Sequence, residues 1–318
     1  MACGIWCLNG SRPRPPSRQG VGASVVFTPP GPWATAVDFF SARFTRIPAN
    51  EWQQRLAQGD VLDAQGTPLR SDSPYQAGQH WYYFRAVATE PRIPFEATVL
   101  WQDEHLLVAD KPHFLPVVPS GHYLQETLLV RLKNQLDLPD LAPLRRMDRD
   151  TAGLVLFSKT PASRGAYHAL FRDHAMRKTY EAIAPWDATL PWPVHRATRI
   201  QPSAHFMQQA EVEVDSGSPV NAITDIAPLE VGTRLARYAL SPITGQRHQL
   251  RVHMAALGLP LVGDGIYPHL TPEGTADYAR PLQLLAKSIA FDDPLTGQPR
   301  HFDSQRSLRS LAELEAEL

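Results

Sequence analysis

Residues 145–158 read RRMDRDTAGLVLFS, the stretch of the sequence on which the predicted fold depends most. Five charged residues in the first six positions run directly into an apolar segment that is typical of a buried strand. Such a group of charges is usually a solvated loop, but here it adjoins the core. We expect Asp148, flanked by Arg146 and Arg149, to stay ionised, because nearby cations favour the charged form. That property suits a nucleophile or an electrostatic stabiliser better than a general acid.

Helix and strand patterns on both sides of this stretch predict one α+β domain over residues 90–318. Apolar residues around a polar turn predict a hairpin over 98–110, and leucines at helical spacing predict a helix over 124–136. The other predicted elements are strands over 153–158, 177–184 and 238–241, a helix over 160–174, a helix over 247–257 that Gly258 closes, and a surface helix in the last 15 residues.

Two regions precede this domain. Residues 1–35 are rich in Pro, Gly, Ser and Arg and lack a clear period, which predicts a flexible tail. Residues 36–89 predict a small N-terminal domain with a short helix over 51–58 that ends at Gly59. The segment 43–61 resembles the alpha-L motif, a small RNA-binding module of ribosomal proteins. A capping subdomain without RNA contacts is the alternative.

A second notable segment, residues 177–182, reads RKTYEA and predicts a strand that contains Tyr180. A single tyrosine in a strand is usually part of the core. Between residues 145 and 178, Lys and Arg outnumber Asp and Glu, although the whole chain has a formal net charge of −1. A local basic patch is therefore compatible with a nucleic-acid partner, which the total charge does not favour.

A third segment, residues 244–253, reads TGQRHQLRVH. Arg247 and Arg251 are four positions apart, so we expect them to share one helix face. His248 and Gln249 fall near the start of the same helix, where backbone N–H groups can also bind phosphate. By themselves these residues predict a basic helix that contacts an anion.

Composition excludes several classes of protein. No stretch approaches the roughly 20 apolar residues that span a bilayer, and the N-terminus lacks a signal-peptide pattern, so we expect a cytoplasmic protein that does not enter a membrane. Cys3 and Cys7 are the only cysteines, and they build neither a disulfide framework nor a four-cysteine zinc site. The sequence also contains no HExxH motif, and we expect no metal site.

The three segments, in this order and spacing, resemble the RluA family of RNA pseudouridine synthases over about residues 95–292. Residues 145–153 match the first signature of the family, roughly His-Arg-Leu-Asp-x-x-Thr-Ser-Gly, and residues 178–182 match the second, Lys-x-Tyr-x-Ala. Residues 244–267 match the third, Thr-Gly-Arg-x-His-Gln-Ile-Arg-x-His followed by Gly-x-Pro-x-x-Gly-Asp-x-x-Tyr. Shorter matches lie at 110–112, 222–224 and 282–286.

The sequence departs from these signatures at several positions. The usual His, Leu and Ser of the first signature are Arg145, Met147 and Ala152, whereas Gln246 and Arg247 stand where the third often has Arg and Thr. None of these changes removes the aspartate, the tyrosine or the later arginine. They therefore concern substrate preference more than activity.

The resemblance implies a pseudouridine synthase fold with a mixed, largely antiparallel central sheet, and isomerisation of specific uridines in structured RNA without a cofactor. Asp148 would start cleavage of the glycosidic bond by attacking or deprotonating the sugar. Tyr180 would stack on the uracil, and Arg251 would pair with Asp148. Arg146 would fill the gap left by the flipped nucleotide, since the bond is reached only after the base leaves the stack.

The resemblance also implies an RNA partner, either ribosomal or transfer RNA. The default oligomeric state is a monomer. Besides Arg146, the expected substrate contacts are Arg149, Thr151, Arg247, His248 and Gln249.

Two other functions stay open. One is an RNA-binding protein of the same fold that has lost catalysis, against which the retention of Asp148, Tyr180 and Arg251 argues. The other is a hydrolase that pairs Asp148 with a second carboxylate, as glycosidases do. Asp150 is close in sequence, but we expect its side chain to point elsewhere.

Overall fold

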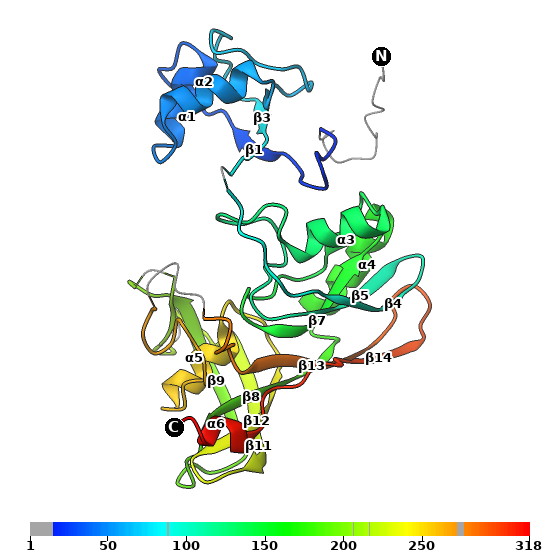
Figure 1. Cartoon of the computed structure of the whole chain (residues 1–318), viewed down its shortest axis with the longest axis vertical. Helices are drawn as coiled ribbons and strands as arrows, with labels where there is room; N and C mark the ends of the chain where they lie inside the picture. Colours follow the sequence, from blue (N-terminus) through cyan, green and yellow to red (C-terminus); the bar gives the residue numbers. More distant parts are fainter. Residues whose placement is uncertain (1–14, 88, 206, 216, 272–276) are drawn as a thin grey trace. The chain divides into compact units, whose positions relative to one another are not determined.

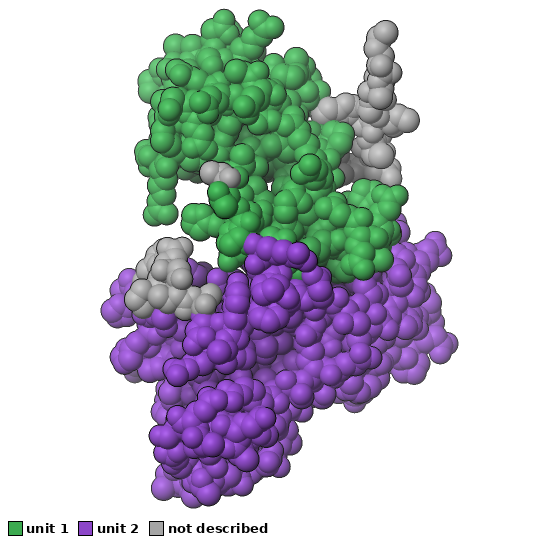
Figure 2. All heavy atoms as spheres, in the orientation of Figure 1, with its two compact units in different colours: residues 1–91, 119–139 green, residues 92–118, 140–318 purple. Residues whose placement is uncertain are grey.

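The computed structural model describes residues 15–87, 89–205, 207–215, 217–271 and 277–318. The chain divides into two compact units (Figure 2), of which unit 1 comprises residues 1–91 and 119–139, and unit 2 comprises residues 92–118 and 140–318. Cys3 and Cys7 lie outside the described residues. No helix in the described ranges is long and apolar enough to cross a membrane.

Unit 1 contains a three-stranded antiparallel sheet with the order β1-β3-β2. Its elements are β1 (Ser24–Phe27), α1 (Ala36–Arg43), α2 (Ala49–Ala57), β2 (Val61–Leu62), β3 (His80–Tyr83) and α3 (Leu128–Leu136). The predicted helix over 51–58 is confirmed as α2. Aromatic side chains form the core of this unit: Phe40 packs on Trp52 with 4.5 Å between ring centroids, and Phe39 and Trp81 are buried beside them.

The predicted N-terminal boundaries need correction. The flexible tail over residues 1–35 is wrong for the described part of that range, because β1 pairs along its whole length with β3. A four-residue strand inside a Pro-rich stretch has too little periodicity to be found from sequence. The segment 119–139 also belongs to unit 1 rather than to the domain predicted from residue 90. Its side chains Leu124 and Val130 form a buried cluster with Val21.

Unit 2 is built on an eleven-stranded sheet that confirms the predicted α+β fold (Figure 1). The main order is β10-β9-β11-β12-β8-β13-β7-β5-β4, with β14 on β13 and β6 on β7. The strands are β4 (Thr98–Gln102), β5 (Leu106–Lys111), β6 (Ala142–Pro143), β7 (Ala152–Ser158), β8 (Arg177–Pro185), β9 (Val194–Pro202), β10 (Gln209–Val212), β11 (Ala222–Val231), β12 (Leu235–Pro242), β13 (Leu284–Asp292) and β14 (Pro299–Asp303). The helices are α4 (Pro161–Arg172), α5 (Gln249–Ala256) and α6 (Leu311–Glu315). Six of these strands, β6, β9, β10, β11, β13 and β14, were not predicted.

A short parallel pairing between β7 and β13 joins the two halves of this sheet. It comprises the pairs Leu285 with Ala152 and Ala286 with Gly153, whereas every other pairing between the named strands is antiparallel. Gly153 has a φ of 106°, and a Cβ placed there would lie 2.3 Å from the carbonyl oxygen of Ala286. Only glycine fits at this position, because it adopts the conformation without strain and leaves room for the neighbouring backbone.

The C-terminal segment differs from the predicted surface helix. α6 contains five residues, and its Leu311 and Leu314 are buried in a cluster with Ile183 and Leu235 of the sheet. Ser310 caps the helix through a capping box with Glu313. The segment therefore closes part of the core of unit 2.

His253 connects α5 to the sheet from a fully buried position. Its Nδ1 lies 2.9 Å from Oγ1 of Thr224, and its Nε2 lies 3.0 Å from Oγ1 of Thr198. The Thr224 hydroxyl also accepts from Nε2 of Gln249, so its own proton is available to Nδ1 of a neutral imidazole. Burial, followed by the nearby Arg196 charge, lowers the pKa of His253 to about 4.

We expect this histidine to make the fold sensitive to acid. The pKa of His253 is lower in the folded state than its ordinary value of 6.5, so the unfolded chain binds the proton first as the pH falls. The contribution is fully present above pH 6.5 and is lost between about pH 6.5 and 4, which removes up to ~3 kcal/mol from the free energy of unfolding. Urea denaturation at pH 7 and pH 4.5 measures this loss. The variant His253→Gln should lose less stability between these pH values, and equal losses in both proteins would contradict the assignment.

Candidate active site

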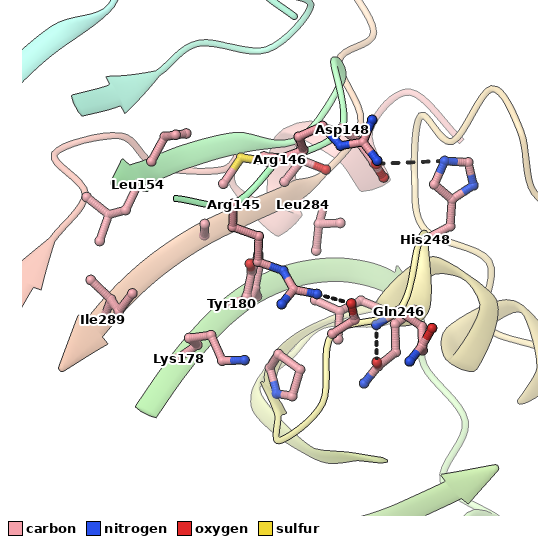
Figure 3. Close-up of a pocket in the computed structure, with 18 of the residues that line it drawn as sticks. Arg145, Arg146, Asp148, Leu154, Lys178, Tyr180, Gln246, His248, Leu284 and Ile289 are labelled. Atoms are coloured by element: carbon pink, nitrogen blue, oxygen red, sulfur yellow. Dashed lines mark hydrogen bonds and ion pairs between the residues drawn. The ribbon is translucent and has the colours of Figure 1, made fainter. Parts of the chain in front are cut away.

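A pocket in unit 2 brings the three sequence segments together (Figure 3). The loop before β7 supplies one wall, the face of β8 supplies a second, and the loop before α5 supplies a third. Apolar residues of β7, α4 and β13 complete it. The polar and charged lining residues are Arg145, Arg146, Asp148, Thr151, Lys178, Tyr180, Thr244, Gln246, His248, Gln249, Arg251 and Ser288.

The loop that carries Asp148 is fixed by groups on and after β5. Lys111, at the end of β5, is fully buried and donates from Nζ to the carbonyl oxygens of Arg149, at 2.8 Å, and Pro112, at 2.9 Å. Nδ1 of His113 lies 2.7 Å from the carbonyl oxygen of Asp150. Burial lowers the pKa of Lys111 to about 7. These contacts hold the backbone directly after Asp148 in place, which restricts the positions that the Asp148 carboxylate can adopt.

Arg251 lies between two carboxylates of different exposure. Its Nε donates to Oδ2 of Asp264 at 2.8 Å, and Nη2 donates to Oδ1 of the same carboxylate. Its Nη1 donates to Oδ2 of Asp148 at 3.3 Å. The Asp264 side chain is fully buried and also accepts the backbone N–H groups of Ile266 and Tyr267, whereas the Asp148 side chain is 30% exposed. The bidentate pair with Asp264 fixes the guanidinium, which presents its remaining edge to Asp148.

His248 lies on the other side of the same carboxylate. Its Nε2 is 3.7 Å from Oδ1 of Asp148, and its Nδ1 is 3.1 Å from Oη of Tyr267. It is the N-cap residue of α5 and has a φ of 56°. Burial lowers the pKa of His248, and the Asp148 carboxylate opposes this effect. Asp148 is thus held between an arginine and a histidine at the mouth of the pocket.

Tyr180 forms part of the opposite wall. It lies on β8, where it pairs with Leu240 of β12 and Ala286 of β13, and its side chain is half-buried. Burial raises the pKa of Tyr180, so the phenol keeps its proton at neutral pH. Arg145 lies beside it in Figure 3 and donates to the carbonyl oxygen of Gly245. That bond joins the loop before β7 to the loop before α5 across the pocket.

Gln249 holds the loop before α5 against β11. Its Oε1 accepts from Oγ1 of Thr244, at 2.8 Å, and from the backbone N–H of Gln246, at 2.9 Å. Its Nε2 donates to the carbonyl oxygen of Ile223 and to Oγ1 of Thr224. The amide thereby uses both donors and both acceptor positions within the protein. Its geometry favours a positioning role over the direct RNA contact expected from sequence.

The structure brings together seven of the nine site residues that the sequence predicts. Asp148, Tyr180, Arg251, Arg146, Thr151, His248 and Gln249 all line the pocket.

Arg149 and Arg247 do not line the pocket. Arg149 is exposed, and its Nε lies 2.9 Å from Oδ1 of Asp150. Arg247 is exposed and precedes α5. The expectation that Arg247 and Arg251 share a helix face is wrong, because the helix begins at Gln249.

Sequence reasoning assigned no role to Asp264. It gave Arg145 and Lys178 only a general role, as members of the basic patch whose Lys and Arg would hold RNA phosphates, although all three stand inside the matched signatures. Asp264 follows Arg251 by 13 positions, and no local pattern reveals that they form an ion pair. Lys178 lies two residues before Tyr180, which places both side chains on one face of a strand. The two-residue spacing from Tyr180 is the sequence pattern that could have identified Lys178 as a pocket residue.

Comparisons with known proteins agree with this arrangement. Residues 105–256 match the family described as RNA pseudouridylate synthase. The chain is 34% identical over 238 residues to an uncharacterized RNA pseudouridine synthase of Synechocystis, an alignment that covers 73% of this chain and 78% of the relative. It is 32% identical over 220 residues to the dual-specificity RNA pseudouridine synthase RluA of Yersinia pestis, covering 64% and 96% of the two chains. The solved structure of human RNA pseudouridylate synthase domain containing 1 has a TM-score of 0.53 at 21% identity and covers 72% and 97%, which shows a shared fold.

Removing the buried partner of Arg251 should cost more stability than removing the exposed one. Asp264→Ala leaves a buried guanidinium without its bidentate partner, and we expect a loss of about 3–5 kcal/mol in the free energy of unfolding. Asp148→Ala removes a partly exposed carboxylate while Asp264 still pairs with Arg251, so about 1 kcal/mol or less is expected. Urea denaturation of both variants makes the comparison. Equal losses would show that the two carboxylates share the charge of Arg251 evenly.

Proposed function

The chain belongs to the RluA family of RNA pseudouridine synthases, and we propose that it isomerises specific uridines of a structured RNA by means of Asp148, without a cofactor. The observation that carries this proposal is the placement of Asp148. Its carboxylate is partly exposed at the pocket, with Arg251 at 3.3 Å and His248 at 3.7 Å. The pocket combines apolar residues, which suit a base, with charged residues, which suit the sugar and phosphate of a flipped nucleotide.

Asp148 would act on the ribose while the base is held in the pocket. Arg251 fixes the orientation of the carboxylate, and both possible first steps, attack on the sugar or removal of a sugar proton, require an ionised oxygen directed at the ribose. Nε2 of His248 lies next to the second carboxylate oxygen of Asp148 and would limit the movement of that oxygen. Burial lowers the pKa of His248 and so favours the neutral imidazole.

Tyr180 would stack on the uracil. Its ring lies on the pocket wall across from the loop of Asp148, and its pKa is raised by burial, so it presents a neutral phenol to the base. Arg146, which is exposed on the loop before β7, would take the place of the base in the RNA stack. Such an exchange offsets part of the few kcal/mol that extrusion of a base requires.

We also propose ribosomal or transfer RNA as the substrate, a monomeric state and a cytoplasmic location, which the sequence predicts. The RNA-binding role of the small N-terminal domain, with the capping role as its alternative, stays a prediction. Exposed Arg43, the last residue of α1, and exposed Arg46, between α1 and α2, are the candidate phosphate contacts in that domain.

The variant Asp148→Asn tests the central assignment. Asn keeps the shape of the side chain but supplies no charged nucleophile or base, so pseudouridine formation should fall by more than about a thousandfold while RNA affinity stays near that of the wild type. The measurement is the pseudouridine content of a uridine-containing RNA after incubation with each protein. Turnover within about tenfold of the wild type would refute the role of Asp148. Wild-type protein that binds RNA without forming pseudouridine would indicate an inactive binding protein, and released uracil would indicate a hydrolase.

Arg146→Ala tests base replacement. The reaction should slow more on a folded RNA hairpin than on a single-stranded oligonucleotide of the same sequence, because extrusion costs little when the target is already unstacked. Initial rates on the two substrates give the ratio. Arg149→Ala serves as the control, since it removes a nearby exposed arginine that does not line the pocket. Equal slowing on both RNAs would mean that Arg146 contacts phosphate instead.

A further inference from the structure

Lys178 is a cation in the pocket that the mechanism above leaves unused. It lies on β8 two residues before Tyr180, so both side chains point to the same face of the strand. Its side chain is half-buried, and its Nζ lies 3.5 Å from the carbonyl oxygen of Thr244, a long contact for a hydrogen bond. Among the described residues, no carboxylate forms an ion pair with Lys178, and the neighbouring charge that acts on it is that of Arg145. A partly buried ammonium without a counterion is unfavourable, which indicates a role other than stability.

The surroundings of Lys178 make this end of the pocket positive. Arg145 lies beside it, and burial, followed by the charge of Arg145, lowers the pKa of Lys178 to about 8. Tyr180 adds no charge at neutral pH, because burial raises its pKa. Asp148 lies farther along the loop before β7, away from Lys178 (Figure 3). An anion that forms in the pocket would therefore find its complementary charge next to the ring of Tyr180.

The proposed reaction forms such an anion. When the bond between N1 of uracil and C1′ of the ribose breaks, the bonding electrons stay on the uracil, which carries one negative charge over N1 and its carbonyl oxygens. The sugar either forms an ester with Asp148 or gives its C2′ proton to Asp148. When C5 bonds to C1′, the ester opens or the proton returns to C2′. The proton on C5 then leaves and N1 gains one, so atoms and charges balance without another reactant.

We propose that Lys178 is a catalytic residue that donates a hydrogen bond from its ammonium group to a carbonyl oxygen of the detached uracil anion. This inference rests on the proposed function and adds the group that stabilises the leaving base. The charge on uracil is absent from the bound uridine and present once the bond has broken. Lys178 therefore stabilises the transition state more than the bound substrate, which raises kcat rather than affinity.

A role in binding an RNA phosphate is the competing explanation, and it predicts different kinetics. A phosphate is charged before and after the reaction, so losing a phosphate contact raises KM and makes the salt dependence of binding shallower. The half-buried position of Lys178, on the same face of β8 as Tyr180, favours contact with the base over contact with the backbone of the RNA.

The test compares Lys178→Met, Lys178→Arg and Lys159→Met on one uridine-containing RNA. Met keeps most of the length of the side chain without its charge, Arg keeps the charge, and Lys159 is a control lysine that does not line the pocket. For Lys178→Met we expect kcat to fall on the order of a hundredfold, with KM within about threefold of the wild type and an unchanged salt dependence of binding. Lys178→Arg should recover part of kcat, and Lys159→Met should resemble the wild type.

The pH profile supplies a second readout. Lys178 is charged below its pKa of about 8, so kcat/KM of the wild type should fall as the pH rises through that value. In Lys178→Arg this fall in kcat/KM, the basic limb of the profile, should occur at a higher pH, because a guanidinium stays protonated. The other groups facing Lys178 are the guanidinium of Arg145 and the phenol of Tyr180, and burial raises the pKa of Tyr180 from its ordinary value of 10.

Three results would overturn the inference: a raised KM with normal kcat in Lys178→Met, unchanged kinetics in both Lys178 variants, or a basic limb that stays in place in Lys178→Arg. Thermal unfolding of each variant identifies a loss of fold, in which case the Lys178→Arg profile alone decides. A wild-type protein that forms no pseudouridine in any RNA would instead refute the proposed function.

Discussion

The buried guanidinium of Arg251 is the interaction on which the candidate site depends. An arginine cannot lose its proton inside a protein, so burying one requires anions around it. Asp264 supplies a fixed anion in the interior, and Asp148 supplies a second at the pocket. One cation thus connects a carboxylate that stabilises the structure with a carboxylate that is free to meet a substrate. The same Asp264 orders the backbone at Ile266 and Tyr267, and Tyr267 in turn contacts His248.

The sequence predicted the central elements because their patterns are local. The apolar run of β7, the Thr-Pro start of α4 and the leucine spacing of α3 each lie within one element, and all three are present. Strands such as β9 and β11 escaped prediction because charged residues and proline interrupt their apolar residues. β9 contains Arg and Pro, and β11 contains Asp and Pro. Their stability comes from partners far away in sequence, which no local pattern contains.

The site residues were also predicted only in part, because contacts between distant parts of the chain leave no local pattern. Asp148, Tyr180 and Arg251 occupy positions in signatures, so a resemblance identified them. The partnership of Arg251 with Asp264 and the bond from Arg145 to Gly245 arise only from folding. The Arg145 guanidinium lies so close to Gly245 that it would have to move to make room for a Cβ there. Arg145 stands at the position of the usual histidine in the first signature.

The two-residue parallel pairing between β7 and β13 has a consequence for how such a protein can diversify. Asp148 enters from the β7 side of that pairing, whereas Tyr180 and the helix of Arg251 belong to the β8 side. Alignment across the pairing is set by Gly153 against Ala286, where no side chain fits. Loops at the outer ends of the long antiparallel hairpins can therefore lengthen or change composition without altering how the reactive groups meet. A change at the rim can therefore alter which RNA is bound while the pairing of Gly153 with Ala286 keeps its geometry.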